Sequence, residues 1–380
     1  MEKKKVNKQE IERPSWSNLP DDMLMSIMEH LRYVDQIRFR VVCKGWRLDT
    51  TYVVKSENKL PWLMTWYWPI VEDGESSSLQ INEEDGSIIT SWCHLYDPIE
   101  KRKQTIVVEN TDDAAIFVGA KFCATKDGWV LFYRREYLNA CKTTSLFFYN
   151  PFTKEIIKLA RSYLKVVSAS FTATPDSPDC LIFTYGKFTE TTTSIGIYSP
   201  IKKKWRRLYF AGYHGRIRSL VYIEGVFYCG FREVMASFNL ATQEWKTYLY
   251  PVVELAGIFT TKYLIESDYS KLLLAYNFSN DKWRVYTFES EEKEETNWWC
   301  EIESLDNGLF FVGIENSILV PVAKETSDLR NSMHYIWNRY GCKSSFYEKA
   351  FEGQSCRQLW FGRENYLNKK IWICQPRVRS

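Results

Sequence analysis

The 380-residue chain has no long apolar run, and its first residues are polar. Its longest apolar stretch, residues 308–323, is interrupted by Glu315 and Asn316 and predicts two strands, whereas a membrane helix needs about 20 apolar residues. Residues 2–13 are too polar to hold the apolar core of a signal peptide. We therefore expect a protein of the cytoplasm or nucleus with no membrane partner.

Cysteine and histidine are present, but not at the spacings that are typical of metal-binding sites. The ten cysteines run from Cys43 to Cys374 with no CxxC pair, which predicts buried free thiols in a reducing compartment. The four histidines lie far apart, and neither HxxxH nor HExxH occurs: His30, His94, His214 and His334. No GxSxG, P-loop or GxGxxG motif is found either. The sequence therefore predicts no catalytic residue, no metal and no cofactor.

The charges are nearly balanced, with 50 Lys and Arg against 47 Asp and Glu, for a net charge of +3. This balance argues against a protein that coats nucleic acid. Two charged runs stand out, a basic one at residues 202–207 (KKKWRR) and an acidic one at 289–295 (ESEEKEE). We interpret both as solvated loops, the alternative for the basic run being attraction of phosphate or of an acidic partner.

Aromatic residues are abundant, at 16% of the chain, which favours β structure. Three segments repeat one pattern, in which an aromatic precedes a polar anchor and a tryptophan follows six residues after the anchor. The anchor and tryptophan pairs are Ser199 with Trp205, Asn239 with Trp245, and Asn277 with Trp283. Weaker copies at residues 95–98 and 148–151 keep the aromatic, polar and proline residues without the tryptophan.

A unit of about 40 to 50 residues with four strands is typical of a β-propeller. Residues 58–380 would hold six or seven such units, so we predict a six- or seven-bladed β-propeller there. The alternative is a series of hairpins in a sandwich or barrel.

The N-terminal part is predicted to be helical, with a charged mobile tail at residues 1–13 and a helical module at 14–57. A first helix opens at Leu19-Pro20 and carries an apolar stripe: Met23, Leu24, Ile27, Met28 and Leu31. Asp35 is the predicted N-cap of a second helix, whose stripe is Phe39, Val42, Cys43 and Trp46. A module this small buries little surface alone, so its apolar residues predict a partner.

Residues 17–24 (SNLPDDML) and 42–47 (VCKGWR) together resemble the F-box motif, over about residues 15–55. The resemblance implies docking to a Skp-type adaptor, which links the chain to a cullin-based ubiquitin ligase. By position it implies nine adaptor-binding or supporting residues: Leu19, Pro20, Leu24, Ile27, Leu31, Phe39, Val42, Cys43 and Trp46. Spacing alone leaves open which of these contact the adaptor and which hold the module together.

The C-terminal part resembles kelch-like repeats and, more closely, the plant F-box family with a large propeller-like domain of formerly unknown function. Short motifs carry this resemblance, at residues 126–132, 149–153, 309–313, 333–337 and 370–376. The family implies a substrate receptor without naming a ligand.

Three functions are compatible with these features. In the first, the chain is the non-catalytic substrate-recognition subunit of a Skp–cullin–F-box ubiquitin ligase, and it acts by holding a target protein close to the ubiquitin donor. In the second, the propeller binds a carbohydrate or small ligand by aromatic stacking and the F-box tethers it. In the third, the chain is an enzyme with acids or histidines converging in the propeller channel.

Overall fold

The computed structural model describes two units, which divide the chain between residues 56 and 57. The residues described are 16, 19–31, 33–39, 46, 60–67, 91–97, 102–108, 115–138, 141–162, 166–212, 215–251, 261–267, 271–277, 283–289, 298–303, 305, 308–313, 316–321, 332–337, 341–346 and 369–374. The predicted tail at residues 1–13 lies outside the described residues, and so do residues 290–295 of the acidic run.

The N-terminal unit contains helices α1 (Asp21–His30) and α2 (Tyr33–Phe39). Pro20 caps α1, and its carbonyl oxygen accepts hydrogen bonds from the amides of Met23 and Leu24, each at 3.1 Å. The prediction that Asp35 caps the second helix was wrong, because α2 already begins at Tyr33. Asp35 instead lies in the first turn, where its carboxylate still faces the positive end of the helix dipole.

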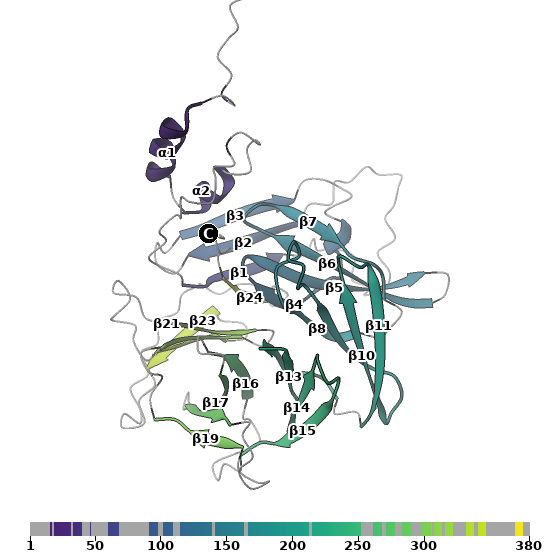
Figure 1. Cartoon of the computed structure of the whole chain (residues 1–380). Coiled ribbons are helices and arrows are strands. Elements are labelled where there is room, and N and C mark those ends of the chain that lie inside the picture. The colour runs from purple at the N-terminus through teal and green to yellow at the C-terminus, as the bar shows by residue number, and fades with distance from the viewer. Residues whose placement is uncertain are drawn as a thin grey trace, which may run out of the picture. The chain divides into compact units, whose positions relative to one another are not determined.

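The described part of the C-terminal unit forms six four-stranded blades of a β-propeller (Figure 1). Four sheets have four strands each, and an eight-stranded sheet consists of two blades joined by a single bridge, Glu266 with Ile318. The predicted propeller fold is thereby confirmed, and the described blades agree with the lower of the two predicted numbers.

The blades are numbered here along the ring, each from its inner to its outer strand. Blade 1 contains β24 (Lys369–Ile373), β1 (Trp62–Tyr67), β2 (Ser91–Asp97) and β3 (Arg102–Val108). Blade 2 contains β4 (Lys121–Lys126), β5 (Trp129–Leu138), β6 (Cys141–Asn150) and β7 (Glu155–Lys158). Blade 3 contains β8 (Val166–Phe171), β9 (Ile182–Lys187), β10 (Thr192–Ser199) and β11 (Lys204–Ala211).

Blade 4 contains β12 (Ser219–Ile223), β13 (Val226–Gly230), β14 (Val234–Asn239) and β15 (Trp245–Leu249). Blade 5 contains β16 (Thr261–Glu266), β17 (Leu272–Asn277), β18 (Trp283–Phe288) and β19 (Trp299–Glu301). Blade 6 contains β21 (Ser317–Pro321), β20 (Gly308–Val312), β22 (Ser332–Trp337) and β23 (Gly341–Phe346). In blade 6, β22 runs parallel to β20, unlike the antiparallel neighbours of the other blades.

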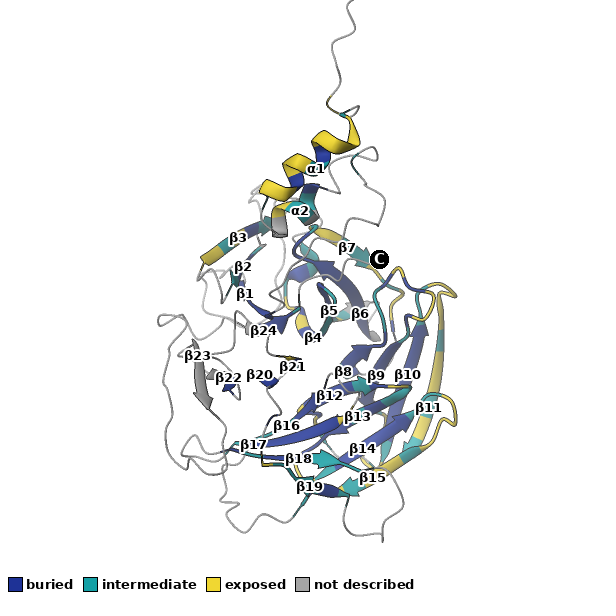
Figure 2. Cartoon of the chain, turned by 60° about the vertical axis from the view of Figure 1, so that its left-hand side comes forward, coloured by how far each residue is buried: buried dark blue, intermediate teal, exposed yellow. Residues whose placement is uncertain are grey.

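The core lies between neighbouring blades, which bury the aliphatic and aromatic residues of their facing sides. Between blades 2 and 3, for example, Leu131 and Phe148 pack in one cluster with Phe171 and Ile182. Figure 2 shows the buried residues along the inner and middle strands and the exposed ones along outer strands such as β11. This layering leaves the loops at the two ends of the ring, and the outer strands, open to partners.

The ring is closed by the last strand of the chain, β24, which pairs antiparallel with the first strand, β1. A hydrogen-bonded node at Asn316 reinforces the closure. Its Nδ2 donates to Thr125 Oγ1 at 2.7 Å and to the carbonyl oxygen of Trp372 at 2.6 Å, and its Oδ1 accepts the amide of Trp372 at 3.2 Å. One side chain thus joins blades 6, 1 and 2.

Three of the repeated polar anchors, Asn150, Ser199 and Asn239, are turn residues between third and fourth strands. The Oδ1 atoms of Asn150 and Asn239 accept backbone amides two residues ahead, each at 2.9 Å, and Ser199 Oγ accepts the Lys202 amide at 3.3 Å. These bonds take the place of backbone turn bonds, which explains the recurring Asn and Ser.

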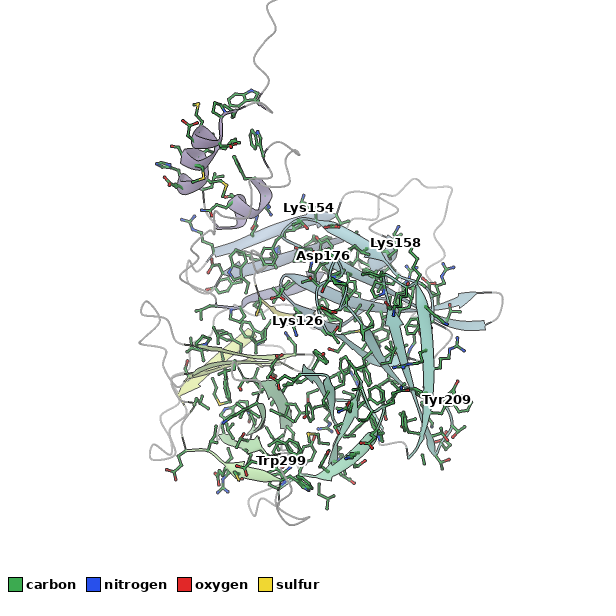
Figure 3. The ribbon with its side chains drawn as sticks, viewed as in Figure 1. Lys126, Lys154, Lys158, Asp176, Tyr209 and Trp299 are labelled. Atoms are coloured by element: carbon green, nitrogen blue, oxygen red, sulfur yellow. The ribbon has the colours of Figure 1, made fainter. Side chains whose placement is uncertain are left out.

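The third tryptophan of the repeat also opens a strand, but at a different place in its blade from the first two. Trp205 and Trp245 open fourth strands, opposite Tyr198 and Phe238, but Trp283 opens the third strand of blade 5, opposite Asn277. The fourth strand of that blade begins at Trp299 (Figure 3). Equal spacing along the chain therefore does not fix which strand of a blade the tryptophan opens.

We expect the Asn316→Ala substitution to lower the propeller's free energy of unfolding by about 2–4 kcal/mol, since three hydrogen bonds of about 1 kcal/mol each are lost and their partners are left partly buried. Urea unfolding measures the change. Asn239→Ala, which removes only a local turn bond, is the control, and an equal or larger loss in that variant would contradict the role of the node.

Candidate functional site

The candidate site is the apolar surface of the N-terminal unit, which is built on a small core. Leu24, Met28 and Phe39 are buried there. The rings of Phe39 and Trp46 stack with centroids 4.5 Å apart, and Trp46 Nε1 donates to the carbonyl oxygen of Trp16 at 2.8 Å. These contacts hold α1 and α2 against the segment that carries Trp46.

A second apolar stripe on α1 remains uncovered in the described structure. Met23 is 52% exposed and Ile27 is 37% exposed, and Pro20 is exposed as well. Positions 20, 23 and 27 follow i, i+3, i+7 spacing and therefore share one face of the helix. Among the described residues, helix α1 thus has one apolar side packed on the core and a second, the stripe of Pro20, Met23 and Ile27, that is exposed.

The nine predicted site residues divide by burial. Leu24 and Phe39 belong to the core, and Leu19, Leu31 and Trp46 are half-buried around it. Pro20 and Ile27 are exposed, whereas Val42 and Cys43 lie outside the described residues. Met23 was not among the predicted site residues, although its i+4 spacing from Ile27 was a signal that could have identified it.

Comparison with known proteins places both parts of the chain. A family model described as the KIB1-4 beta-propeller matches residues 95–347, and the F-box domain matches residues 16–48. The chain belongs to the KIB1-4 beta-propeller family. It is an F-box protein of the plant type, and an F-box joined to a propeller is in general the architecture of substrate-recognition subunits of Skp–cullin–F-box ligases.

Two relatives from Arabidopsis thaliana are named as F-box proteins. The F-box/kelch-repeat protein At1g57790 is 27% identical over 247 residues, 63% of this chain and 60% of the relative, so the chain spans less than two thirds of that protein. The F-box protein At4g00893 is 24% identical over 394 residues, 96% of this chain and 86% of the relative.

Among solved structures, the beta-propeller domain of the Trilobed protease from Pyrococcus furiosus aligns with a TM-score of 0.35 and 8% identity, covering 73% of this chain and 89% of that one. At that score the alignment carries no inference about function.

Most of the described cysteines of the propeller are buried, whereas Cys300 and Cys374 are half-buried. Cys93, Cys180 and Cys229 are buried thiols, and burial raises the pKa of Cys180 to about 12. At neutral pH a thiol with so high a pKa is almost entirely protonated, and the protonated thiol is a poor nucleophile. Within the described ranges, no group of three His, Cys, Asp or Glu side chains converges as metal ligands would, and no helix has the length and apolar character to cross a membrane.

His334 is the buried histidine of the KIB1-4 propeller. Its Nε2 lies 2.8 Å from Ser332 Oγ, and its ring stacks on Phe311 with centroids 4.9 Å apart. Burial lowers the pKa of His334 from its ordinary 6.5 to about 3. The imidazole is therefore neutral in the folded protein at any pH at which the protein is expected to work.

This burial predicts acid sensitivity of the propeller. The unfolded chain binds a proton at His334 below pH 6.5 and the folded chain does not until about pH 3, so the stability is complete above pH 6.5 and is lost as the pH falls between those values. His334→Asn should flatten the slope of unfolding free energy against pH by up to about 1.4 kcal/mol per pH unit. Urea unfolding between pH 7 and pH 5 tests this, with His94→Asn as the control; an unchanged slope would contradict it.

Proposed function

We propose that the chain is the substrate-recognition subunit of a Skp–cullin–F-box ubiquitin ligase, in which the F-box docks a Skp-type adaptor and the propeller binds a target protein. The exposed stripe of Pro20, Met23 and Ile27 carries the first half of the proposal. Covering Met23 and Ile27 would contribute about 1.5–3 kcal/mol for each fully buried side chain.

The mechanism is proximity. The adaptor connects the F-box to a cullin, and the target held by the propeller is presented to the ubiquitin donor at a high effective concentration. No side chain of this chain has to react, so the chain is proposed to be non-catalytic. The buried free cysteines suit a reducing compartment, and we propose that the protein acts in the cytoplasm or nucleus.

Substituting the exposed stripe should separate binding from folding. Ile27→Lys, or Met23→Lys, places a charge where the adaptor would exclude water and should weaken binding about tenfold or more, while the helical circular dichroism stays unchanged. The control is Glu29→Lys, an exposed position on the opposite side of α1. Leu24→Ala should abolish binding by unfolding the module, because core truncations cost about 2–5 kcal/mol.

Co-purification with a Skp-type adaptor, followed by calorimetric titration, measures these effects on the full chain. Failure of the folded wild-type protein to bind the adaptor would exclude the proposal. So would equal binding by wild type and Ile27→Lys.

A second candidate function is favoured by one pair of exposed aromatics on blade 3. Phe188 is 61% exposed and Tyr209 48% exposed, and their ring centroids lie 4.6 Å apart, beside the outer strand β11 (Figure 3). Rings of this kind can stack on a sugar or another flat ligand. If they do, a glycan array will show binding by the wild-type protein that Phe188→Ala/Tyr209→Ala abolishes, with adaptor binding retained; an array without signal would remove this candidate.

A further inference from the structure

Three separate segments meet where the inner strands of blades 4 and 5 begin. The amide of Leu264 donates to Ser219 Oγ at 3.2 Å, which joins β16 to β12, and the amide of Arg218 donates to the carbonyl oxygen of Gly230 at 2.8 Å. A Cβ at Gly230 would lie 2.5 Å from Ser219 Oγ, so the close approach of these strands depends on glycine there. Arg218, Lys262 and the turn between β13 and β14 are thereby brought to one end of the ring.

Lys262 is held in a fixed position at this end. Its Nζ lies 4.2 Å from the ring centroid of Tyr250 and 5.5 Å from that of Tyr276, and it donates to the carbonyl oxygen of Arg232 at 3.0 Å. The two tyrosine hydroxyls donate to the carbonyl oxygens of Phe231 and Pro251, each at 3.3 Å. The ammonium group therefore rests on two anchored rings, with little side-chain freedom left to lose on binding.

Positive charge accumulates around this ammonium. Burial, and then the charge of Arg218, lower the pKa of Lys262; Arg232 acts in the same direction, and Glu233 opposes them. The side chains of Arg218 and Arg232 are exposed. Within the described part of the chain, neither arginine nor Lys262 forms an ion pair with a carboxylate. The basic cluster of Arg218, Arg232 and Lys262 thus carries three positive charges, which the single opposing carboxylate of Glu233 offsets only in part.

We propose that the basic cluster of Arg218, Arg232 and Lys262 binds a phosphate group carried by a serine, threonine or tyrosine of the target protein. A phosphate offers three acceptor oxygens and close to two negative charges, which suits two guanidinium groups and one ammonium better than a single carboxylate does. The inference rests on the proposed function, because it gives the chemical class of the target.

The basic run at residues 202–207 is a different kind of surface. Its Lys and Arg side chains are exposed along the turn before β11 and along that outer strand, and its Trp205 packs into the core. Lysine and arginine on an edge strand keep other strands from pairing with it. No ring or carbonyl contact fixes these cations in the described structure, which makes them a control of equal charge.

The test uses the whole 380-residue chain and three probes. Two are tripeptides blocked at both ends, Gly-phosphoserine-Gly and Gly-Glu-Gly, and the third is inorganic phosphate. Calorimetric titration at low salt compares wild type with Arg218→Gln/Arg232→Gln and with Arg206→Gln/Arg207→Gln, which removes the same charge from β11. We expect the first double variant to weaken phosphoserine binding about tenfold or more, and the second to leave it within about twofold.

Lys262→Met is a third variant, because it keeps the aliphatic contacts with Tyr250 and Tyr276 while removing the charge. Equal weakening by both arginine double variants, equal affinity for the phosphoserine and glutamate peptides, or no binding by folded wild type would each overturn the proposal. Adaptor binding is measured on the same preparations. A wild-type protein that binds the adaptor but not the phosphoserine peptide would therefore exclude the phosphate site alone. A wild-type protein that binds the phosphoserine peptide but not the adaptor would exclude the receptor role alone.

Discussion

The pairing of β24 with β1 is the constraint on which the propeller depends. It joins residues 369–373 to residues 62–66, so the first blade exists only after nearly all of the chain has been placed. Each blade buries its apolar sides against its two neighbours, so a gap anywhere in the ring would expose the apolar sides of two blades. Asn316 strengthens this joint because its one amide group holds the backbone of β24 and the side chain of Thr125 at once.

A closed ring of this kind confines function to its ends and its outer strands. The blade faces are used to bury one another, and the buried thiols and His334 are kept uncharged by the same burial. Lys126 extends from the end of β4 to within 5.5 Å of the ring centroid of Tyr222 on β12, so even the inner strands of blades 2 and 4 are tied across the ring (Figure 3). What remains variable is the set of turns, where the exposed cations and aromatics are found.

The helical and β parts of the chain, and many of the residues that form turns, could be predicted from the sequence because they depend on local spacing. An Asn or Ser that accepts backbone amides two or three residues ahead is recognisable from its own hairpin. The place of a hairpin within its blade is not local, and for that reason the spacing did not show that Trp283 opens a third strand while Trp205 and Trp245 lie in fourth strands. The number of blades was likewise undetermined, since it depends on the parallel pairing of β20 with β22 and on β24 joining β1.

The two candidate binding surfaces also differ in how far they depend on local spacing. Spacing on α1 predicted an apolar helix, but a helix with both Leu24 and Ile27 has two apolar sides, and only the packing of Phe39 and Trp46 decides which is covered. The basic cluster could not be predicted at all, because Arg218, Arg232 and Lys262 come from three strands or turns with no common motif. Its geometry is set by Ser219 and Gly230, residues that carry no charge, and so the chemistry of the surface is specified by the core beneath it.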